Sequence, residues 1–366
     1  MHGTPIYCED GNVYFINGNN LVDGKIVISA ETKKVNESQQ STADKSLDDT
    51  TILMSINGTI GNLAYYSGER LMLGKSAAYI KVSEFDKRFV YAYLQAPSVQ
   101  EYFMDSLTGT TIKNLGLKAI REMIMFIPQD VDEQKRIGKF LDYLDHLITL
   151  HQRKYDKLVV IKKSMLEKMF PKNGQTKPEI RFSGFTDDWE QRKLGEYVSI
   201  ISGEAPSKFE EGTELYVKVD DLNYNDKYVV DTQNKVAEHS TVKRVTKGSV
   251  VFPKRGAAIM TNKVRIIGID SYMDTNMMAL TSEKLDSEFL YNIISKEGLY
   301  KIADTSTIPQ INNKHVEPYE VTIPSLDEQR RIGAYFKQLD HLITLHQREL
   351  EKLKKIKLSM LEKMFV

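Results

Sequence analysis

A run of basic side chains that contains no acidic residue extends from His239 to Gly268. Cations in such a run can bind phosphate oxygens, and arginine can also donate paired hydrogen bonds to a guanine edge. We therefore predict a DNA-binding surface here, with hydroxyl and amide groups beside the cations. The alternative is a charged edge strand that its lysines and arginines keep soluble. The candidate residues are Lys243, Arg244, Lys254, Arg255, Thr261, Asn262, Lys263 and Arg265.

Two polar loops, one in each half of the chain, provide further candidates for contacts with bases. In the loop of the second half, the amide and hydroxyl groups suit adenine edges, and a capped surface turn is the alternative for that loop. The loop of the second half contains Thr307, Gln310, Asn312, Asn313 and Lys314. The loop of the first half contains Thr110, Thr111, Lys113 and Asn114, and the strand–loop region before it contains Asn57, Asn62, Tyr65, Arg70 and Lys75. For Tyr65, a place in the core or at a sheet edge is the alternative.

Residue patterns that would indicate catalysis are weak. The sequence contains no glycine-rich P-loop, no Asn/Asp-Pro-Pro-aromatic motif of amino-methyltransferases and no Cys/His metal-ligand cluster. Asp23, Glu31 and Lys33 mimic the loose carboxylate–carboxylate–lysine spacing of some nucleases, and a solvated polar loop is the simpler interpretation. We therefore predict neither a catalytic residue nor a metal site.

Two long segments position these candidates, and they are copies of each other. Residues 132–170 recur at 327–365 with a constant offset of 195, and 27 of the 39 positions are identical. Both copies open with a helix-start signal, which is Asp130–Glu133 in the first and a capping box at Ser325–Glu328 in the second. Each copy predicts a helix of roughly 55–60 Å.

Apolar residues in both copies recur in alternating steps of three and four, which is typical of a coiled-coil seam. At one seam position each copy has a lysine, Lys162 or Lys357, which either sets the helix register or extends to solvent beside Ile161 and Ile356. We interpret His151 and His346 as packing residues rather than ligands or switches. The predicted seam contains Leu144, Ile148, His151, Leu158 and Met165, and Leu339, Ile343, His346, Leu353 and Met360.

The length predicts two or three domains, and short alternating runs between turn signals predict that the globular ones are α+β. The chain of 366 residues has 41% hydrophobic residues, no apolar run long enough to span a membrane and one cysteine, Cys8, which together favour the reducing cytoplasm. The net charge is zero, yet residues 131–181 have 12 basic and 7 acidic groups and residues 327–366 have 9 and 6. A neutral chain with local basic surfaces remains compatible with DNA binding.

The repeat also sets the expected domain organisation. We predict a first globular domain at 1–130, a first long helix at 131–170, a linker at 171–181, a second globular domain at 182–325 and a second long helix at 326–366. Within the domains we expect strands at Thr51–Ile56 and Ser249–Phe252, each before a turn, and helices at Phe85–Met104 and Ser287–Ala303. The two long helices are expected to pair antiparallel, which gives the fold an internal pseudo-two-fold repeat.

The order of these elements resembles that of the specificity subunit of type I restriction-modification systems. The resemblance covers essentially the whole chain, and the duplicated order of its motifs is more specific than any one motif. The matching segments are Phe126–Pro128 with Asp132–Gly138, Val321–Pro324 with Asp327–Gly333, the loop dipeptides Thr111-Ile112 and Thr307-Ile308, and Trp189–Gly195 at the entry to the second domain.

The resemblance implies that each globular domain reads one half of an interrupted double-stranded DNA target. The helix pair would set the spacing between the two halves and dock two modification subunits, which supply adenine N6-methyltransferase activity. A restriction and translocase subunit would join them for cleavage. The specificity subunit itself would bind no cofactor and catalyse nothing, with S-adenosylmethionine on the modification subunits and ATP and Mg on the restriction subunit.

The first domain departs from this pattern. Phe182–Tyr197 has no copy before the first domain, which begins near Gly3–Pro5, the counterpart of Gly203–Pro206. We therefore expect a first domain that is shortened at its start, or one that another element completes. Two other functional classes are the alternatives, a stand-alone nuclease or methyltransferase with a degenerate motif, and a scaffold that binds protein.

Overall fold

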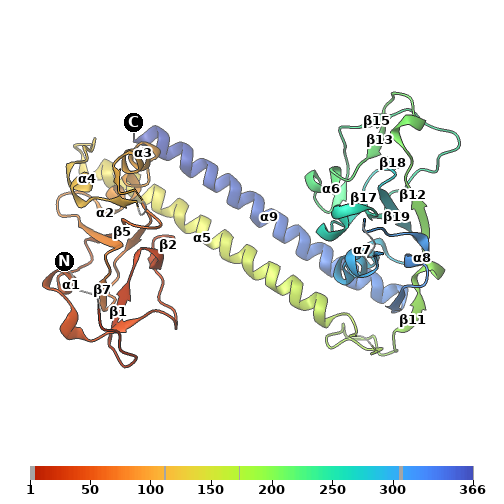
Figure 1. The fold of residues 1–366 in the computed structure, drawn as a ribbon, viewed down its shortest axis with the longest axis horizontal. Helices are drawn as coiled ribbons and strands as arrows, with labels where there is room; N and C mark the ends of the chain where they lie inside the picture. The colour runs from red at the N-terminus through yellow and green to blue at the C-terminus, as the bar shows by residue number, and fades with distance from the viewer. Residues whose placement is uncertain (1–4, 111–112, 173, 305–307, 366) are drawn as a thin grey trace. The chain divides into compact units, whose positions relative to one another are not determined.

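The structure, a computed structural model, describes residues 5–110, 113–172, 174–304 and 308–365. Its internal contacts divide the chain into two compact units. The first unit comprises Met1–Lys154 with His346–Val366, and the second comprises Tyr155–Leu345. Each unit combines strands and short helices with one segment of each long helix, α5 (Val131–Lys168) and α9 (Leu326–Met364) (Figure 1). The mixed content confirms the predicted α+β class.

The globular part of the first unit consists mainly of short strands. In chain order its elements are β1 (Val13–Ile16), η1 (Gly18–Asn20), β2 (Leu21–Val22), β3 (Lys25–Ile26), β4 (Lys34–Val35), η2 (Glu37–Gln39), α1 (Thr42–Lys45), β5 (Thr51–Ser55), β6 (Leu63–Tyr65), β7 (Leu71–Leu73), β8 (Ala77–Lys81), α2 (Lys87–Tyr93), α3 (Pro97–Asp105), β9 (Leu107–Thr108), β10 (Asn114–Leu115) and α4 (Leu117–Glu122). The η elements are 3-10 helices.

The globular part of the second unit repeats this plan and adds strands at its start and end. Its elements are β11 (Glu190–Lys193), η3 (Leu194–Glu196), β12 (Ser199–Ser202), η4 (Pro206–Lys208), β13 (Glu214–Val217), α6 (Asp221–Tyr224), β14 (Tyr228–Val229), β15 (Lys235–Val236), β16 (Val250–Pro253), η5 (Gly256–Thr261), β17 (Arg265–Ile267), β18 (Tyr272–Met273), β19 (Met277–Thr281), α7 (Ser287–Glu297), η6 (Leu299–Lys301), α8 (Asn313–Val316) and β20 (Glu320–Ile323).

The two globular parts share one strand topology. In the first unit β5 pairs antiparallel with β6 and β8, and β1 pairs antiparallel with β4 and parallel with β7. In the second unit β16 has the same relation to β17 and β19, and β13 to β15 and β18. The sheet around β16 is larger, because β12 pairs with β19 and β14 pairs with β17.

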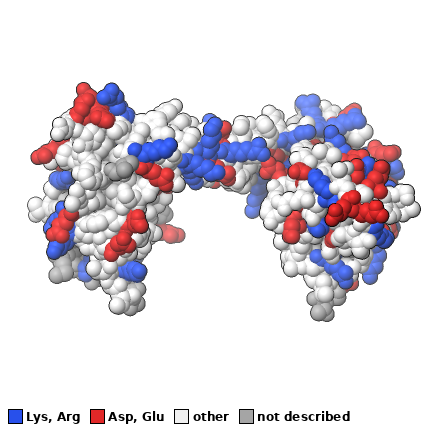
Figure 2. Space-filling model, turned by 90° about the horizontal axis from the view of Figure 1, so that it is seen from above, with Lys and Arg blue, Asp and Glu red and all other residues white. Residues whose placement is uncertain are grey.

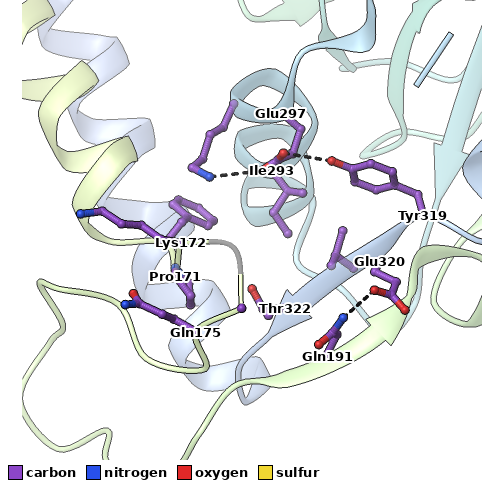
Figure 3. Close-up of a pocket in the computed structure, with 13 residues that line it drawn as sticks. Pro171, Lys172, Gln175, Gln191, Ile293, Glu297, Tyr319, Glu320 and Thr322 are labelled. Atoms are coloured by element: carbon purple, nitrogen blue, oxygen red, sulfur yellow. Dashed lines mark hydrogen bonds and ion pairs between the residues drawn. The ribbon is translucent and has the colours of Figure 1, made fainter. Parts of the chain in front are cut away.

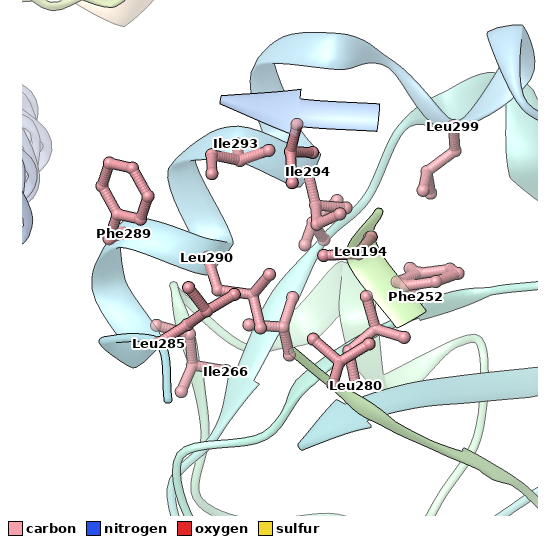
Figure 4. Close-up of a cluster of buried hydrophobic side chains, with 14 of the residues drawn as sticks. Leu194, Phe252, Ile266, Leu280, Leu285, Phe289, Leu290, Ile293, Ile294 and Leu299 are labelled. Atoms are coloured by element: carbon pink, nitrogen blue, oxygen red, sulfur yellow. The ribbon is translucent and has the colours of Figure 1, made fainter. Parts of the chain in front are cut away.

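The central strands β5 and β16 are buried along their whole length because both of their faces are covered. Alternate residues of β16, Val250 and Phe252, pack with α7, the linker end of α5 and the start of α9 in one core cluster (Figure 4). Val251, on the opposite face, packs in a separate cluster with β13. Strands buried on both faces read as continuous apolar runs rather than as alternating ones, which is the pattern that the sequence has here.

A buried glutamine attaches each globular part to its long helix. Gln134 Oε1 accepts from Asp86 N at 3.1 Å and Gln134 Nε2 donates to Pro128 O at 2.9 Å. Gln329, its copy in the repeat, makes the equivalent bonds to Asp286 N at 3.1 Å and to Pro324 O at 3.0 Å. Both amide side chains are 2% exposed. Each glutamine thereby satisfies two backbone groups that would otherwise be buried without partners.

A glycine four residues after each glutamine permits this close attachment. A Cβ atom at Gly138 would lie 2.6 Å from Phe89 N, and one at Gly333 would lie 2.5 Å from Asp286 Oδ1. The starts of α2 and α7 therefore rest directly on the backbone of the long helices. The repeated sequence preserves this contact on both helices although the globular sequences differ.

Two predicted helices are wrong in extent. The expected helix at Phe85–Met104 is two helices, α2 and α3, because Pro97 occupies the first turn of α3 and Ala96 before it is extended with ψ 138°. A residue before proline is disfavoured in helical conformation. The expected helix at Ser287–Ala303 ends as α7 at Glu297, and Gly298 with φ +80° follows it. The strands expected before the two turns are confirmed as β5 and β16.

Each seam lysine forms an ion pair within its own unit, and its partner is the equivalent aspartate of the repeat. Lys162 lies 2.5 Å from Asp340 in the second unit, and Lys357 pairs with Asp145 in the first. With the repeat offset of 195, these are two copies of one ion pair. The interpretation that the lysines set the helix register is supported over the one in which they extend freely to solvent, because a shifted register would separate both pairs.

Within each unit, seam residues of the two long helices pack beside the globular core. Leu144, Leu353 and Met360 pack in the main cluster of the first unit, and Leu158, Met165 and Leu339 in that of the second. His151 and His346, which are copies of each other, meet in the first unit with their Nδ1 atoms 3.1 Å apart. Ile148 and Ile343 are half-buried.

Candidate nucleic-acid interface

In the second unit, the end of β16 lies beside the polar loop that precedes α8. The backbone N–H of Ile311 donates to the carbonyl of Lys254 at 2.9 Å. Arg255, which follows Lys254, and Gln310, which precedes Ile311, form an isolated antiparallel bridge. The structure therefore joins the predicted basic run and the predicted polar loop at one place.

The first unit has the same junction. The backbone N–H of Leu115 donates to the carbonyl of Ile56 at 2.8 Å, and Asn57 and Asn114 form an isolated antiparallel bridge. In both units the bridge follows the central strand and joins it to the loop before a short helix. Asn57 is thus the counterpart of Arg255, and Asn114 is the counterpart of Gln310.

The side chains at the two bridges differ in a way that matters for base recognition. Arg255 is exposed and Gln310 is half-buried, whereas Asn57 and Asn114 are both half-buried. Arginine pairs with the O6 and N7 acceptors of guanine, and asparagine and glutamine pair with the N6 and N7 of adenine. The two junctions therefore offer different hydrogen-bonding groups on the same backbone arrangement.

Several predicted residues of the second unit are available to a ligand. Lys243, Thr261, Asn313 and Lys314 are exposed, as is Arg255. Figure 2 shows lysine and arginine side chains gathered along the long helices, whereas acidic and basic side chains intermingle over the strands of the second unit.

Lys254 is half-buried at this junction. Burial and the neighbouring Arg255 lower the pKa of its ammonium group, while Glu204 and Asp274 oppose that change. A phosphate bound beside Lys254 would favour the charged form and relieve this destabilisation.

Other predicted cations of the basic run have partners within the unit. Arg244 pairs with Glu214 and lies over the ring of Tyr272, 5.5 Å from its centroid. Lys263 donates to Asn223 Oδ1, and Arg265 donates to backbone carbonyls, including that of Asn225 at 3.1 Å. These contacts give Arg244, Lys263 and Arg265 structural roles. Contacts of these three cations with DNA remain predictions.

Two predicted amides also have structural partners. Asn262, in left-handed conformation with φ +49°, donates to the carbonyl of Ser295 at 2.9 Å and accepts from Leu299 N at 3.0 Å. Asn312 caps the short helix α8 in a capping box with His315. The alternative of a capped turn is therefore correct for Asn312, and base contacts through either amide remain predictions.

In the first unit, two predicted residues are held by the fold. Asn62 Nδ2 donates to the carbonyl of Leu21 at 3.1 Å. Tyr65 stacks on Tyr91 with ring centroids 4.2 Å apart, and burial, followed by the charge of Asp142, raises the pKa of the Tyr65 hydroxyl. Tyr65 thus packs against the core, and its contact with DNA remains a prediction.

The remaining candidates of the first unit are exposed. They are Arg70, Lys75, Thr110 and Lys113. Thr111 and Thr307, one in each loop, lie outside the described residues. The weak nuclease pattern gains no support, because Asp23 lies in the turn between β2 and β3 and Lys33 lies over the ring of Tyr7 at 4.3 Å.

The lining of one cavity in the second unit contains none of the residues that form the junction. In the second unit a cavity of about 240 Å³ lies between the end of α5, α7 and the paired strands β11 and β20 (Figure 3). Glu297 accepts from the hydroxyl of Tyr319 at 2.9 Å at its edge. Among the residues that the structure describes, no group of three or more His, Cys, Asp or Glu side chains could hold a metal ion. No helix in the described ranges is long and apolar enough to cross a membrane.

Sequence reasoning missed the contacts that hold each globular part on the helices. Besides the two glutamines, Lys227 lies 2.5 Å from Glu288 and 2.7 Å from Asp340, which also binds Lys162. The sequence signal for these contacts is the aspartate that lies at the same place beside the seam in both repeats, Asp145 and Asp340. A carboxylate that is retained next to an apolar seam indicates a buried partner.

The shared strand topology and the repeated long helix define a protein with a duplicated domain. The family model for the type I restriction modification DNA specificity domain matches residues 5–159 and 186–355. The chain therefore belongs to this family and is a type I restriction-modification specificity subunit, the non-catalytic component of such a system.

Individual relatives agree with this assignment. The specificity subunit of the type I restriction enzyme MjaVIII from Methanocaldococcus jannaschii is 27% identical over 312 residues, which are 78% of this chain and 73% of that protein. The putative MjaX specificity subunit of the same organism is 24% identical and covers 81% of this chain and 72% of its own length. A crystal structure of the type I S subunit from M. genitalium has the same fold, with a TM-score of 0.65, 18% identity and coverage of 98% and 90%.

Proposed function

We propose that each globular part reads one half of a bipartite DNA sequence through its junction. Asn57 and Asn114 would contact bases in one half, and Arg255 and Gln310 in the other. The observation that carries the proposal is that two globular parts of divergent sequence place polar side chains at the same backbone bridge. A scaffold whose two parts bind protein would have no need for base-reading groups at equivalent positions.

Phosphate contacts would orient each part on the duplex without specifying sequence. The exposed cations Lys243, Lys314, Arg70, Lys75 and Lys113 are suited to this role. Because these contacts displace counterions, binding should weaken steeply as salt rises. The structural cations Arg244, Lys263 and Arg265 would then contribute mainly by shaping the loops.

The long helices would form an antiparallel coiled coil that fixes the number of unread base pairs between the half-sites. The register ion pairs Asp145–Lys357 and Lys162–Asp340 support this role, because they hold each helix at one axial position. One turn of B-DNA measures about 34–36 Å, and a helix of this length spans roughly 55–60 Å. Two modification subunits would dock on the helices and a restriction subunit would join them, in the cytoplasm.

The test lengthens both helices by one heptad, inserted after Arg153 and after Arg348, which are equivalent positions in the repeat. Seven residues preserve the seam register and add roughly 10 Å, which is about three base pairs. Adenine methylation would be mapped genome-wide in cells that express the chain with its cognate modification subunits. We expect a motif with unchanged half-sites and a longer spacer.

A matched control places the same seven residues in the exposed linker after Gln175, where they should not alter the spacer. A changed half-site with an unchanged spacer would contradict the role of the helices. DNA binding by the purified complex, measured at several salt concentrations, separates this outcome from a loss of assembly.

A further inference from the structure

In the second unit, one lysine side chain neutralises a carboxylate where the globular part meets the long helices. The ammonium group of Lys227 lies 2.7 Å from Asp340 and 4.4 Å from the centroid of the Tyr291 ring. The side chains of Lys227 and Asp340 are only 9% and 17% exposed. A carboxylate and an aromatic ring that face the same sheltered place both favour an ammonium group there.

The first unit has the same carboxylate and the same ring. Asp145 occupies in α5 the position that Asp340 occupies in α9. Tyr91 is the fifth residue after the N-cap of α2, as Tyr291 is the fifth residue after the N-cap of α7. A cavity of about 630 Å³ lies beside Asp145 and Tyr91 in place of the lysine.

A tight turn forms one wall of this cavity. Asp23 and Gly24 connect β2 with β3, and both line the cavity. A Cβ atom at Gly24 would lie 3.0 Å from the hydroxyl oxygen of Tyr91, so the turn approaches the ring at a residue that has no side chain. Asp23 is exposed and has neither a hydrogen bond nor an ion pair among the residues that the structure describes. The turn therefore adds a free carboxylate to the cavity.

The charged groups of the lining leave an excess of carboxylate inside the cavity. Asp145 pairs with Lys357, and Asp142 lies 3.5 Å from Arg88, whereas Asp23 has no cation of its own. The other lysine and arginine side chains of the lining are exposed, so water and salt screen their charges. They are Lys25, Lys139, Arg153 and Lys354.

Two stacked tyrosines respond to the same excess. Burial raises the pKa of the Tyr91 hydroxyl, and the carboxylates of Asp145, Asp23 and Asp142 raise it further. The hydroxyl oxygen of Tyr65, which stacks on Tyr91, is buried without a hydrogen-bond partner in the described part of the chain. A bound cation would stabilise the carboxylates and could donate a hydrogen bond to the Tyr65 oxygen.

The spacing of the carboxylates suits an extended organic cation. Among the described residues, no three His, Cys, Asp or Glu side chains are close enough together to hold a metal ion. A molecule with two ammonium groups at the ends of an apolar chain can reach carboxylates that lie apart. Its chain would also fill the space that a single ion leaves open.

We propose that this cavity of the first unit binds a linear aliphatic diamine. One ammonium group would lie against Asp145 and Tyr91, as the ammonium group of Lys227 does at the equivalent place of the second unit. The other would bind Asp23, and the chain between them would pass the Tyr65 hydroxyl. This binding site is independent of which bases the protein reads.

The probe is 1,4-diaminobutane, titrated into the full chain and followed by calorimetry. We expect saturable binding of one molecule per chain. Asp23→Asn should weaken it on the order of tenfold, because a charged hydrogen-bond partner is lost. Asparagine tolerates the left-handed conformation of residue 23, which has φ +48°. Asp10→Asn is the matched control, because it changes an exposed carboxylate outside the cavity and should leave the affinity unchanged.

A second variant, Tyr65→Phe, separates binding from the stability of the fold. The Tyr65 hydroxyl has no hydrogen bond to lose, so the melting temperature of the free chain should not fall. The diamine should nevertheless bind more weakly, because one acceptor in the cavity is gone.

Four results would overturn the proposal. The first is no saturable binding at diamine concentrations up to about 10 mM. The second is equal affinity of the wild type and Asp23→Asn, which would place the diamine elsewhere on the surface. The third is equal affinity for 1-aminobutane, which has one ammonium group. The fourth is tighter binding of inorganic phosphate than of the diamine, which would assign the cavity to an anion held by its exposed cations.

Discussion

The two units attach their globular parts to identical helix motifs in different ways. In the first unit, Gly24 forms a parallel bridge with Ala64, the middle residue of β6. In the second unit, Tyr228 pairs in parallel with Ile266, the middle residue of the equivalent strand β17. The residues before them, Asp23 and Lys227, are therefore equivalent. Lys227 binds Glu288 and Asp340 and lies over the ring of Tyr291, 4.4 Å from its centroid.

In the first unit the same place is a cavity of about 630 Å³, which Asp23, Arg88, Tyr91 and Asp145 line together with Lys357. Burial raises the pKa of Asp145, and the ammonium of Lys357 acts against that change. A repeated helix therefore does not by itself determine how tightly a globular part is held. Lys227 and Glu288 form an ion pair here in the second unit, whereas Asp23 and Arg88 line the open space in the first.

The largest expected effect comes from Lys227→Met. Burial alone would lower the pKa of Lys227, but Asp340 and Glu288 raise it above the usual value. Removing one partner of a buried ion pair costs about 3–5 kcal/mol because the other charges stay buried. We expect a loss of this size in the free energy of unfolding of the second unit, measured by amide exchange of β16 and β17.

Lys235→Met is the matched control, because Lys235 pairs with Asp231 on the surface at 2.9 Å. An exposed ion pair contributes little to stability because water and salt screen it. Similar losses for both variants would show that the buried network does not hold the second globular part.

A smaller effect is expected from neutralising the repeated aspartates. Asp340 binds two lysines, Lys162 and Lys227, whereas Asp145 binds one, Lys357. A hydrogen bond to a charged group contributes about 1.5–3 kcal/mol. Asp340→Asn should therefore destabilise its unit about twice as much as Asp145→Asn destabilises the other, and the two variants are each other's control. Equal losses in the free energy of unfolding would show that Asp340 and Asp145 stabilise their units to the same extent.

The smallest expected effect is a pH dependence of the histidine pair in the first unit. Burial, followed by His151 and Lys154, lowers the pKa of His346 below its usual value of 6.5. The unfolded chain then binds a proton more readily than the folded one, so stability is full above about pH 6.5 and falls as the pH drops toward the lowered pKa. Thermal melts between about pH 7.5 and 5.5 should show this fall. His346→Gln should abolish it, and an unchanged slope in that variant would assign it to other groups.

The sequence predicts the long helices, their repeat and the central strands because these depend on local patterns. The seam spacing and the copied motif suffice for α5 and α9, and apolar runs before turns suffice for β5 and β16. Pro97, which divides the expected helix at Phe85–Met104, was also visible in the sequence, since the residue before a proline leaves helical conformation.

The remaining contacts could not be found in this way because they join positions distant in the chain. The equivalence of Asp23 and Lys227 follows from strand pairing, and the surrounding sequences are too different to align. The bridge between Arg255 and Gln310 likewise depends on how two loops meet. For the same reason, the basic run did not reveal that Arg244 and Arg265 are held by the fold while Arg255 is exposed.

The most direct test of the account compares adenine methylation maps of cells that express the chain, with its modification subunits, as wild type, Arg255→Ala or Asn57→Ala. A good side-chain contact to one base contributes about 1–3 kcal/mol of discrimination. We predict a bipartite motif for the wild type, relaxed at one half by Arg255→Ala and at the other half by Asn57→Ala. If both variants altered the same half, or if neither altered the motif while the complex assembled, the proposed division of reading between the two junctions would be contradicted.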